Sequence, residues 1–258
     1  MKKILYMIPV LLLLVVGMYF HNKAGIKDEE VISLNKDILN DYEDIIIKHG
    51  NDEEKLIALT FDDGPDKDFT PQILDILKEN DVKATFFVVG EMVEWNTEIL
   101  KREYNEGHEI GNHTFTHINV AKRSYSEINK EISETQEAVK KIIGKEPSLF
   151  RPPYRAISKN MCTIAKDKNM NIVLWSNLDP RDWSNPGVNY IVDTIMNKVQ
   201  NGTIILLHDY NNARNSTTQT VQALKIVVPR LKEQGYKFVT VSELIEHTNN
   251  EKQTENNK

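Results

Sequence analysis

Short apolar runs alternate with helical patterns over most of the chain. Runs of roughly four to seven apolar residues are typical of strands that are covered on both faces. They predict strands at residues 56–61, 83–89, 109–112, 149–150, 171–175, 203–207 and 237–241. Apolar positions three and four apart predict helices between them, at residues 71–79, 93–105, 126–143, 158–168, 188–199 and 218–234. We expect Ser242 to cap a short last helix that ends near His247.

This alternation indicates an α/β fold in which helices join parallel strands. Seven such units predict a distorted (β/α) barrel of about seven units, complete or incomplete. An open doubly wound sheet is the alternative. It is less favoured because no glycine-rich phosphate loop follows the first strand.

The N-terminal segment, residues 1–20, has the pattern of a membrane signal. Lys2 and Lys3 precede an apolar run of seventeen residues that only Pro9 and Gly17 interrupt. A helix of this length spans about 25 Å, close to the lower limit for crossing a bilayer. No small-x-small cleavage site follows the run. We therefore expect an uncleaved single-pass anchor in the cell membrane with the rest of the chain outside, and a cleaved signal peptide on a secreted protein is the alternative.

Two polar segments flank the predicted α/β region, which covers residues 55–247. Residues 21–54 are mostly charged and polar, with apolar residues such as Leu34 and Ile38 at helical spacing. This pattern predicts an amphipathic helix that forms a stalk. Residues 248–258 contain no apolar side chain and are expected to be disordered.

The composition is that of an ordinary globular protein. Of the 258 residues, 40% are hydrophobic and 27% are charged, which is enough for one large domain. A net charge of −6, without any Lys/Arg block, argues against nucleic-acid partners. Cys162 is the single cysteine, so an intramolecular disulfide is impossible, and we expect this side chain in the core.

Polar clusters follow five of the predicted strands. They are Asp62 with Asp63, His113 with His117, residues 151–154, Asp179 with Asp182 and Trp183, and His208 with Asp209. In a barrel the C-terminal ends of the strands share one rim, where catalytic groups converge. Each cluster alone has an ordinary explanation as a helix cap or turn, but five at equivalent positions are hard to attribute to chance. Two carboxylates and two imidazoles suffice to hold one divalent metal and leave a free carboxylate beside it, which is equipment for hydrolysis.

Five segments in order resemble the motifs of the polysaccharide deacetylases, the NodB-homology group that forms carbohydrate esterase family 4. The segments are TFDDGP at 60–65, HTFTH at 113–117, RPPY at 151–154, DPRDW at 179–183 and LLHD at 206–209. The resemblance covers roughly residues 55–245 and is specific, because all five motifs occur in order. It implies that the predicted region 55–247 is a catalytic domain with a NodB-type distorted barrel.

The resemblance assigns a metal site and a base. It implies that Asp63, His113 and His117 hold a divalent metal, expected to be zinc, with cobalt or another divalent ion possible. Three protein ligands leave room for water and substrate, as a catalytic site requires. Asp62 would act as the general base, and Arg151 would pair with Asp62 and orient it.

Across the reacting bond from the metal and the base, the resemblance implies a general acid and the walls of a substrate site. His208 would protonate the leaving nitrogen, and Asp182 would hydrogen-bond His208 and raise its pKa. The backbone N–H of Tyr154 would stabilise the oxyanion. Trp183 and Leu206 would form apolar walls that receive the sugar and the acetyl methyl group.

The expected activity is metal-dependent removal of N-acetyl groups from N-acetylglucosamine residues of cell-wall peptidoglycan, with release of acetate. The expected partners are this acetylated polysaccharide and, through the N-terminal helix, the membrane. Deacetylation of chitooligosaccharide, poly-N-acetylglucosamine or xylan and spore-wall muramic acid deacetylation remain alternatives. A non-enzymatic wall-binding protein is the alternative from a different class.

The other titratable residues of note are expected to have structural roles. Asp179 would support its loop, and Asp209 would cap or orient a neighbouring segment. The remaining histidines lie in flanking segments or away from the rim: His21, His49, His108 and His247.

Overall fold

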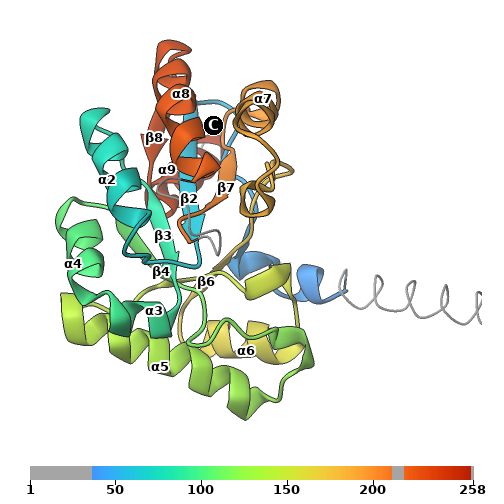
Figure 1. The fold of residues 1–258 in the computed structure, drawn as a ribbon. Coiled ribbons are helices and arrows are strands. Elements are labelled where there is room, and N and C mark those ends of the chain that lie inside the picture. The colour runs from blue at the N-terminus through green and yellow to red at the C-terminus, as the bar shows by residue number, and fades with distance from the viewer. Residues whose placement is uncertain (1–36, 211–217, 257–258) are drawn as a thin grey trace, which may run out of the picture. The chain divides into compact units, whose positions relative to one another are not determined.

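Parallel strands form the centre of the fold, as the apolar runs predict (Figure 1). The structure is a computed structural model, and it describes residues 37–210 and 218–256. The strands are β1 (Ile46–Ile47), β2 (Leu56–Asp62), β3 (Thr85–Val88), β4 (Glu109–Asn112), β5 (Leu149–Phe150), β6 (Asn171–Val173), β7 (Ile204–His208) and β8 (Lys237–Val239). Their order in the sheet is β1-β6-β5-β4-β3-β2-β7, and β8 pairs with the first half of β2.

The sheet is singly wound and curls into an incomplete barrel. From β2 to β6 each strand pairs with the next one along the chain, all in parallel. In an open doubly wound sheet the strand order would run outward from the first strand to both sides in two halves. Here five strands in a row, β2 to β6, follow chain order to one side, and the sheet curls, so that alternative is wrong. The segment after β6 links the sheet to β7, because Ser176 N–H donates to Ile204 O (3.2 Å) and Ile204 N–H donates to Ser176 Oγ (3.0 Å). The predicted barrel is therefore present as a curled half-barrel.

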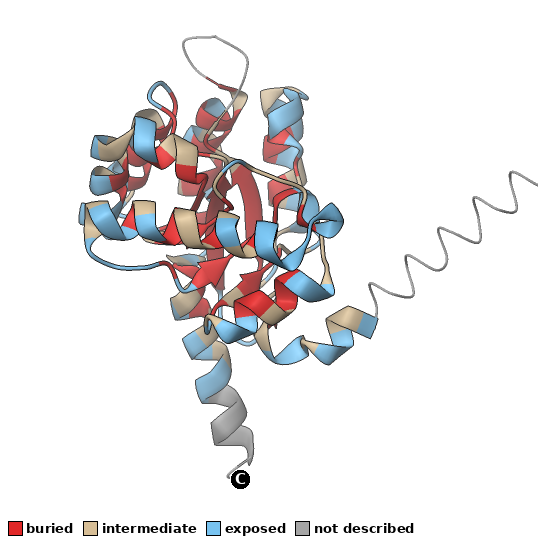
Figure 2. Cartoon of the chain, turned by 90° about the horizontal axis from the view of Figure 1, so that it is seen from below, coloured by how far each residue is buried: buried red, intermediate tan, exposed pale blue. Residues whose placement is uncertain are grey.

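Helices cover the outer face of the strands and turn their apolar sides inward (Figure 2). They are α2 (Thr70–Glu79), α3 (Gly90–Trp95), α4 (Thr97–Asn105), α5 (Tyr125–Ile143), α6 (Lys159–Asp167), α7 (Val188–Lys198), α8 (Gln219–Glu233) and α9 (Val241–Asn256). Short 3-10 turns are η1 (Glu43–Ile45), η2 (Val120–Lys122), η3 (Pro153–Arg155) and η4 (Asp182–Ser184). A capping box of Ser124 and Glu127 starts α5, and Gly144 ends it at φ 76°, in the left-handed region that glycine adopts without strain.

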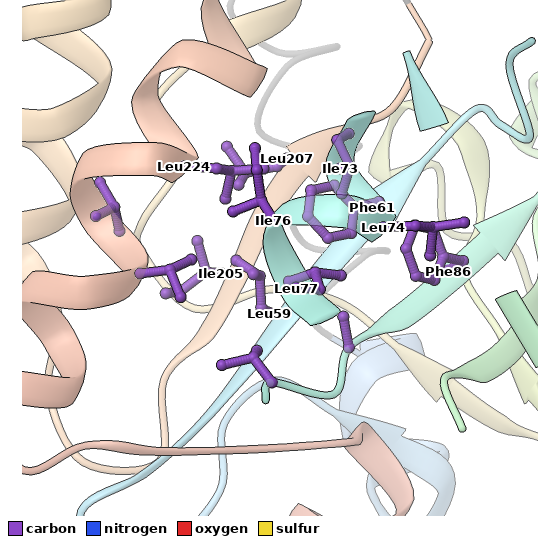
Figure 3. Packing of buried hydrophobic residues seen from close by; sticks show 14 of the residues in the cluster. Leu59, Phe61, Ile73, Leu74, Ile76, Leu77, Phe86, Ile205, Leu207 and Leu224 are labelled. Carbon is purple, nitrogen blue, oxygen red and sulfur yellow. The ribbon is translucent and has the colours of Figure 1, made fainter. Parts of the chain in front are cut away.

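The main core lies between β2, its neighbours and the outer helices (Figure 3). All seven residues of β2 are buried, which is why five of them are apolar, and only Thr60 and Asp62 are polar. Phe61 of β2 stacks on Phe86 of β3 with ring centroids 5.0 Å apart. Ile73 and Leu77 of α2 pack on this layer from outside (Figure 3). This packing fixes the strand ends that carry the polar clusters.

Three segments differ from the sequence prediction. Ile46 and Ile47, inside the predicted helical stalk, form β1 and pair with β6, because β-branched residues suit a sheet edge. The predicted helix 93–105 is interrupted at Asn96, which separates α3 from α4. The last helix begins at Val241, so Ser242 lies inside it and is not its cap; Thr240, which accepts from Glu243 N–H, takes that place. The helix also does not end near His247 but continues to Asn256 through the segment expected to be disordered.

The chain divides into two units, residues 1–43 and residues 44–258. In the first unit the described part includes a short helix at residues 37–41. The predicted membrane segment 1–20 and the start of the predicted stalk lie outside the described residues. Over residues 37–210 and 218–256, no helix combines the length and the apolar character needed to cross a membrane.

Candidate active site

The polar clusters meet in one cleft of about 850 Å³ at the C-terminal ends of the strands. The register of β2 and β7 places Asp62 directly opposite His208. The cleft is lined by the predicted residues Asp62, Asp63, His113, His117, Tyr154, Trp183, Leu206 and His208. The other two predicted residues, Arg151 and Asp182, are fully buried and contact Asp62 and His208. The structure thus brings together all ten residues that the sequence singles out.

Asp63, His113 and His117 form a cluster suited to a metal. Asp63 Oδ1 lies 3.4 Å from His113 Nε2 and 3.2 Å from His117 Nε2. His113 Nδ1 lies 2.7 Å from the carbonyl oxygen of Arg151. Because a carbonyl only accepts, Nδ1 donates its proton to it, and Nε2 is the ring nitrogen directed at Asp63. Two ring nitrogens and one carboxylate oxygen thus converge on a space that a cation could share.

Two further observations fit a cation at this cluster. The possible ligand atoms of the three residues all lie within 4.8 Å of one another. Asp63 Oδ1 is buried and has no hydrogen-bond partner among the described residues. Burial works to raise the pKa of Asp63, but the facing rings of His113 and His117 outweigh it and lower the pKa. One carboxylate and two imidazoles are a ligand set for a catalytic divalent ion.

The HTFTH segment is a turn and not a helix. Thr114 and His117 have φ of 67° and 56°, in the left-handed region that side chains disfavour. Glu131 of α5 holds this turn, since its carboxylate accepts from the N–H groups of Phe115 (2.9 Å) and Thr116 (2.8 Å). Sequence reasoning missed Glu131, because one acidic residue in an amphipathic helix carries no distinguishing signal.

Arg151 orients Asp62 from below the cleft. Arg151 Nη1 donates to Asp62 Oδ1 (2.7 Å) and to Thr60 Oγ1 (2.8 Å). The guanidinium also stacks on the ring of Phe87, 4.0 Å from its centroid. These contacts occupy Asp62 Oδ1, while Oδ2 lies 3.8 Å from His113 Nε2 at the metal cluster. One carboxylate oxygen of Asp62 is therefore held and the other is directed to the reaction space.

Asp182 holds His208 through two contacts. Asp182 Oδ1 lies 2.8 Å from His208 Nδ1, and Oδ2 accepts from the His208 backbone N–H at 2.8 Å. Thr220 Oγ1 also donates to Asp182 Oδ2 (2.8 Å), a contact that the sequence did not indicate. Burial works to lower the pKa of His208, but the charge and hydrogen bond of Asp182 outweigh it and raise the pKa to about 10. The imidazole is therefore protonated near neutral pH.

Asp209 orients the loop after β2, as the sequence predicts. Its Oδ1 accepts from Gly64 N–H (3.0 Å) and its Oδ2 from Thr70 Oγ1 (2.6 Å). A Cβ at Gly64 would lie 2.0 Å from Asp209 Oδ2, so only glycine permits this approach. Burial raises the pKa of Asp209 to about 7. Asp179 likewise supports its own loop, accepting from Arg181 N–H at 2.8 Å.

Aromatic side chains form much of the cleft wall. Tyr154 is 67% exposed, and its hydroxyl lies 3.1 Å from His117 Nδ1. Trp183 is 56% exposed and lies on η4. Trp95 and Trp175 also line the cleft, and sequence reasoning missed both because neither lies in a motif. Exposed aromatic faces in a cleft suit the apolar faces of sugar rings.

The remaining described histidines lie outside the cleft. His49 Nδ1 contacts Ser176 Oγ (2.8 Å), and His247 pairs with Glu54 at 2.9 Å. His108 Nδ1 accepts from the backbone N–H of Ala84, and burial lowers the pKa of this ring to about 4. His21 lies outside the described residues.

The comparisons with known proteins agree with this geometry. Residues 49–173 match the family model described as polysaccharide deacetylase. A peptidoglycan-N-acetylglucosamine deacetylase of Bacillus cereus is 46% identical over 195 residues, which are 75% of this chain and 90% of that protein. A crystal structure of a peptidoglycan N-acetylglucosamine deacetylase has a TM-score of 0.75 and 39% identity, covering 78% of this chain and 93% of that chain. A family 4 acetyl xylan esterase from Clostridium thermocellum, in complex with a cobalt ion, has a TM-score of 0.67 and 39% identity, covering 73% and 89%.

Proposed function

Because the chain belongs to the polysaccharide deacetylase family, we propose that it removes N-acetyl groups from N-acetylglucosamine residues of cell-wall peptidoglycan, releasing acetate. One observation carries the proposal: the cluster of Asp63, His113 and His117 lies in the same cleft as Asp62 and His208. A metal-ligand set, a held carboxylate and a protonated imidazole are the groups that amide hydrolysis needs.

Asp63, His113 and His117 would hold a divalent cation. When bound, the cation would polarise the acetyl carbonyl and lower the pKa of a water molecule. The cobalt ion named with the acetyl xylan esterase supports a metal in this fold. In this chain the orphaned Oδ1 of Asp63 supports it independently.

Asp62 would take the proton from the attacking water. The Asp62 carboxylate is paired with Arg151 through Oδ1, which keeps that oxygen out of the reaction and leaves Oδ2 to accept the proton. Attack on the acetyl carbon places negative charge on the former carbonyl oxygen. The backbone N–H of Tyr154 would stabilise that oxygen.

His208 would complete the reaction by donating a proton to the nitrogen of the breaking C–N bond. The electron pair of the C–N bond goes to the nitrogen, so the amine leaves neutral and the acyl group leaves as acetic acid. The acid then ionises to acetate, and the proton that Asp62 took from the water passes through solvent to reprotonate His208. Asp182 keeps the imidazole protonated and oriented through Nδ1, which leaves Nε2 to act. Trp183 and Leu206 would form the walls that receive the sugar and the methyl group.

The names of two of these relatives, both peptidoglycan deacetylases, support peptidoglycan as the polymer. The acetyl xylan esterase shows that the same fold also serves another acetylated polymer. We further propose that residues 1–20 anchor the enzyme in the cell membrane with the cleft outside, where the wall is the nearest substrate.

The test is acetate release by the full chain from N-acetylated peptidoglycan, chitin oligomers and acetylated xylan, with and without a chelator. We expect release from peptidoglycan that stops with chelator and returns with divalent ion. Asp62→Asn and His208→Ala should each lower turnover by roughly 10²–10⁴-fold, whereas His247→Ala should not change it. Turnover that survives both site substitutions would refute the assigned acid and base, and binding without any turnover would indicate a wall-binding protein.

A further inference from the structure

A second cavity of about 290 Å³ adjoins the cleft, and Trp175 lines both. Its lining includes Lys48, Arg155 and Lys198. We infer that this basic pocket binds a carboxylate carried by the polymer beside the reacting sugar, such as those of peptidoglycan stem peptides. The inference rests on the proposed function and names the part of the substrate that the enzyme would select.

The charge of the pocket stands out against the rest of the molecule. The chain carries a net charge of −6, yet three exposed cations meet here. Within residues 37–210 and 218–256, none of the three forms an ion pair with a carboxylate. His49, which also lines the pocket, lies 2.9 Å from the carboxylate of Asp52 through its Nε2. The pocket therefore offers positive charge for an anion from outside.

Arg155 adopts a backbone conformation that its side chain disfavours. Its φ is 54°, in the left-handed region, which a residue with a Cβ rarely adopts. Strained residues of this kind concentrate at binding and catalytic sites. The guanidinium lies over the Trp175 ring, 4.9 Å from its centroid. This placement holds the positive charge at the border between the pocket and the cleft.

The floor of the pocket is built in advance by hydrogen bonds. Ser176 Oγ donates to the carbonyl of Lys48 (3.1 Å) and accepts from Ile204 N–H (3.0 Å). His49 Nδ1 lies 2.8 Å from the same hydroxyl. These contacts fix the backbone that carries Lys48 against Ser176, so the floor of the pocket needs no backbone rearrangement to receive an anion.

A carboxylate matches the pocket better than a neutral group. Arginine and lysine together provide a planar fork and a mobile ammonium, which are the usual partners of carboxylates. Peptidoglycan carries such carboxylates next to its acetylated sugars, whereas chitin and acetylated xylan are neutral there. The pocket would therefore favour an acidic glycan over a neutral one at the same acetyl site.

The test measures affinity by calorimetry, independently of turnover. The ligands are peptidoglycan strand fragments with free stem-peptide carboxylates, the same fragments with those carboxylates amidated, and the N-acetylglucosamine tetramer. The variant is Arg155→Gly with Lys198→Gln, since glycine adopts the local φ without strain. The control is Lys130→Gln, another exposed lysine, on α5.

We expect wild-type protein to bind the acidic fragments about tenfold more tightly than the amidated ones, and less so as salt rises from about 50 to about 500 mM. The double variant should lose this preference and keep its affinity for the tetramer, and the control should match wild type. Equal wild-type affinity for acidic and amidated fragments would overturn the inference.

Acetate release from the neutral tetramer separates the two proposals. Release without any acidic preference would refute the pocket and leave the deacetylase intact. Acidic preference without release from any substrate would refute the deacetylase and leave a site for acidic glycans.

Discussion

The carbonyl oxygen of Arg151 lies 2.7 Å from Nδ1 of His113, while the side chain of Arg151 donates to Asp62. One buried residue therefore orients both a metal-cluster imidazole and the proposed base. Its backbone serves the first and its guanidinium serves the second. A side-chain substitution can separate these two effects.

Arg151→Lys should lower kcat by roughly 10²-fold, because the lysine cannot donate to Asp62 and Thr60 in the same fork. Metal affinity should change much less, since the backbone carbonyl still accepts from His113. Acetate release and metal titration measure the two effects, and thermal unfolding checks the fold. Equal losses of kcat and metal affinity would contradict this separation.

Tyr154→Phe should weaken metal binding by roughly tenfold or more. The substitution removes the hydroxyl that contacts His117 Nδ1 at 3.1 Å, and such outer contacts hold a ligand ring in place. The backbone N–H of residue 154 is kept, so turnover at saturating metal should stay close to wild type. Tyr190→Phe, an exposed tyrosine on α7, is the control. An unchanged metal dissociation constant would show that the hydroxyl has no such role.

Asp182→Asn should move the alkaline limb of the kcat/KM profile to lower pH by about one unit or more. The acid works only when protonated, so activity falls as the pH rises through the pKa of His208. Asp182 raises that pKa to about 10 against the effect of burial, and removing its charge lowers the pKa. Asp193→Asn, on the outer helix α7, should leave the profile unchanged. A limb that does not move would exclude His208 as the acid.

Glu103→Leu should stabilise the protein by about 1–3 kcal/mol at about pH 7.5. Glu103 is fully buried in α4, and neither carboxylate oxygen has a hydrogen-bond partner among the described residues. Burial, with the charge of Asp209, raises the pKa of Glu103 well above its ordinary value. The unfolded chain ionises this group near pH 4.5, so the folded state binds more protons above that pH and stability falls as the pH rises.

Chemical denaturation at several pH values tests this linkage. The gain from Glu103→Leu should shrink toward pH 5, where the unfolded chain also begins to hold the proton. Glu103→Gln should flatten the pH dependence without restoring apolar packing, and it separates charge from packing. A gain that is the same at every pH would mean that packing alone is responsible.

Much of the fold follows from local patterns in the sequence. The run 56–61 predicts β2 because a strand covered on both faces needs apolar residues throughout. The two residues of β1 are too short for any periodicity, and their partner β6 lies more than a hundred residues away. The interruption at Asn96 depends on side-chain bonds to Pro65 and Met92 that no window of sequence reveals.

The residues of the candidate site also fall into those that the sequence reveals and those that only the folded structure reveals. Residues that lie in one of the five motifs, such as Asp63 and His113, are recognisable because the chemistry demands those residue types at those positions. Glu131 and Thr220 act on the site from distant helices, and their residue types are common on any helix surface. Their roles depend on tertiary distance and become visible only when the chain is folded.

Cys162 is completely buried in α6, and burial raises the pKa of its thiol to about 12. Such a thiol stays protonated and unreactive toward alkylating reagents. Because Cys162 is the single cysteine, maleimide reagents should not label the folded native chain. A cysteine placed at Trp95, which is 71% exposed on the cleft wall, would take up a single fluorophore and report glycan binding directly.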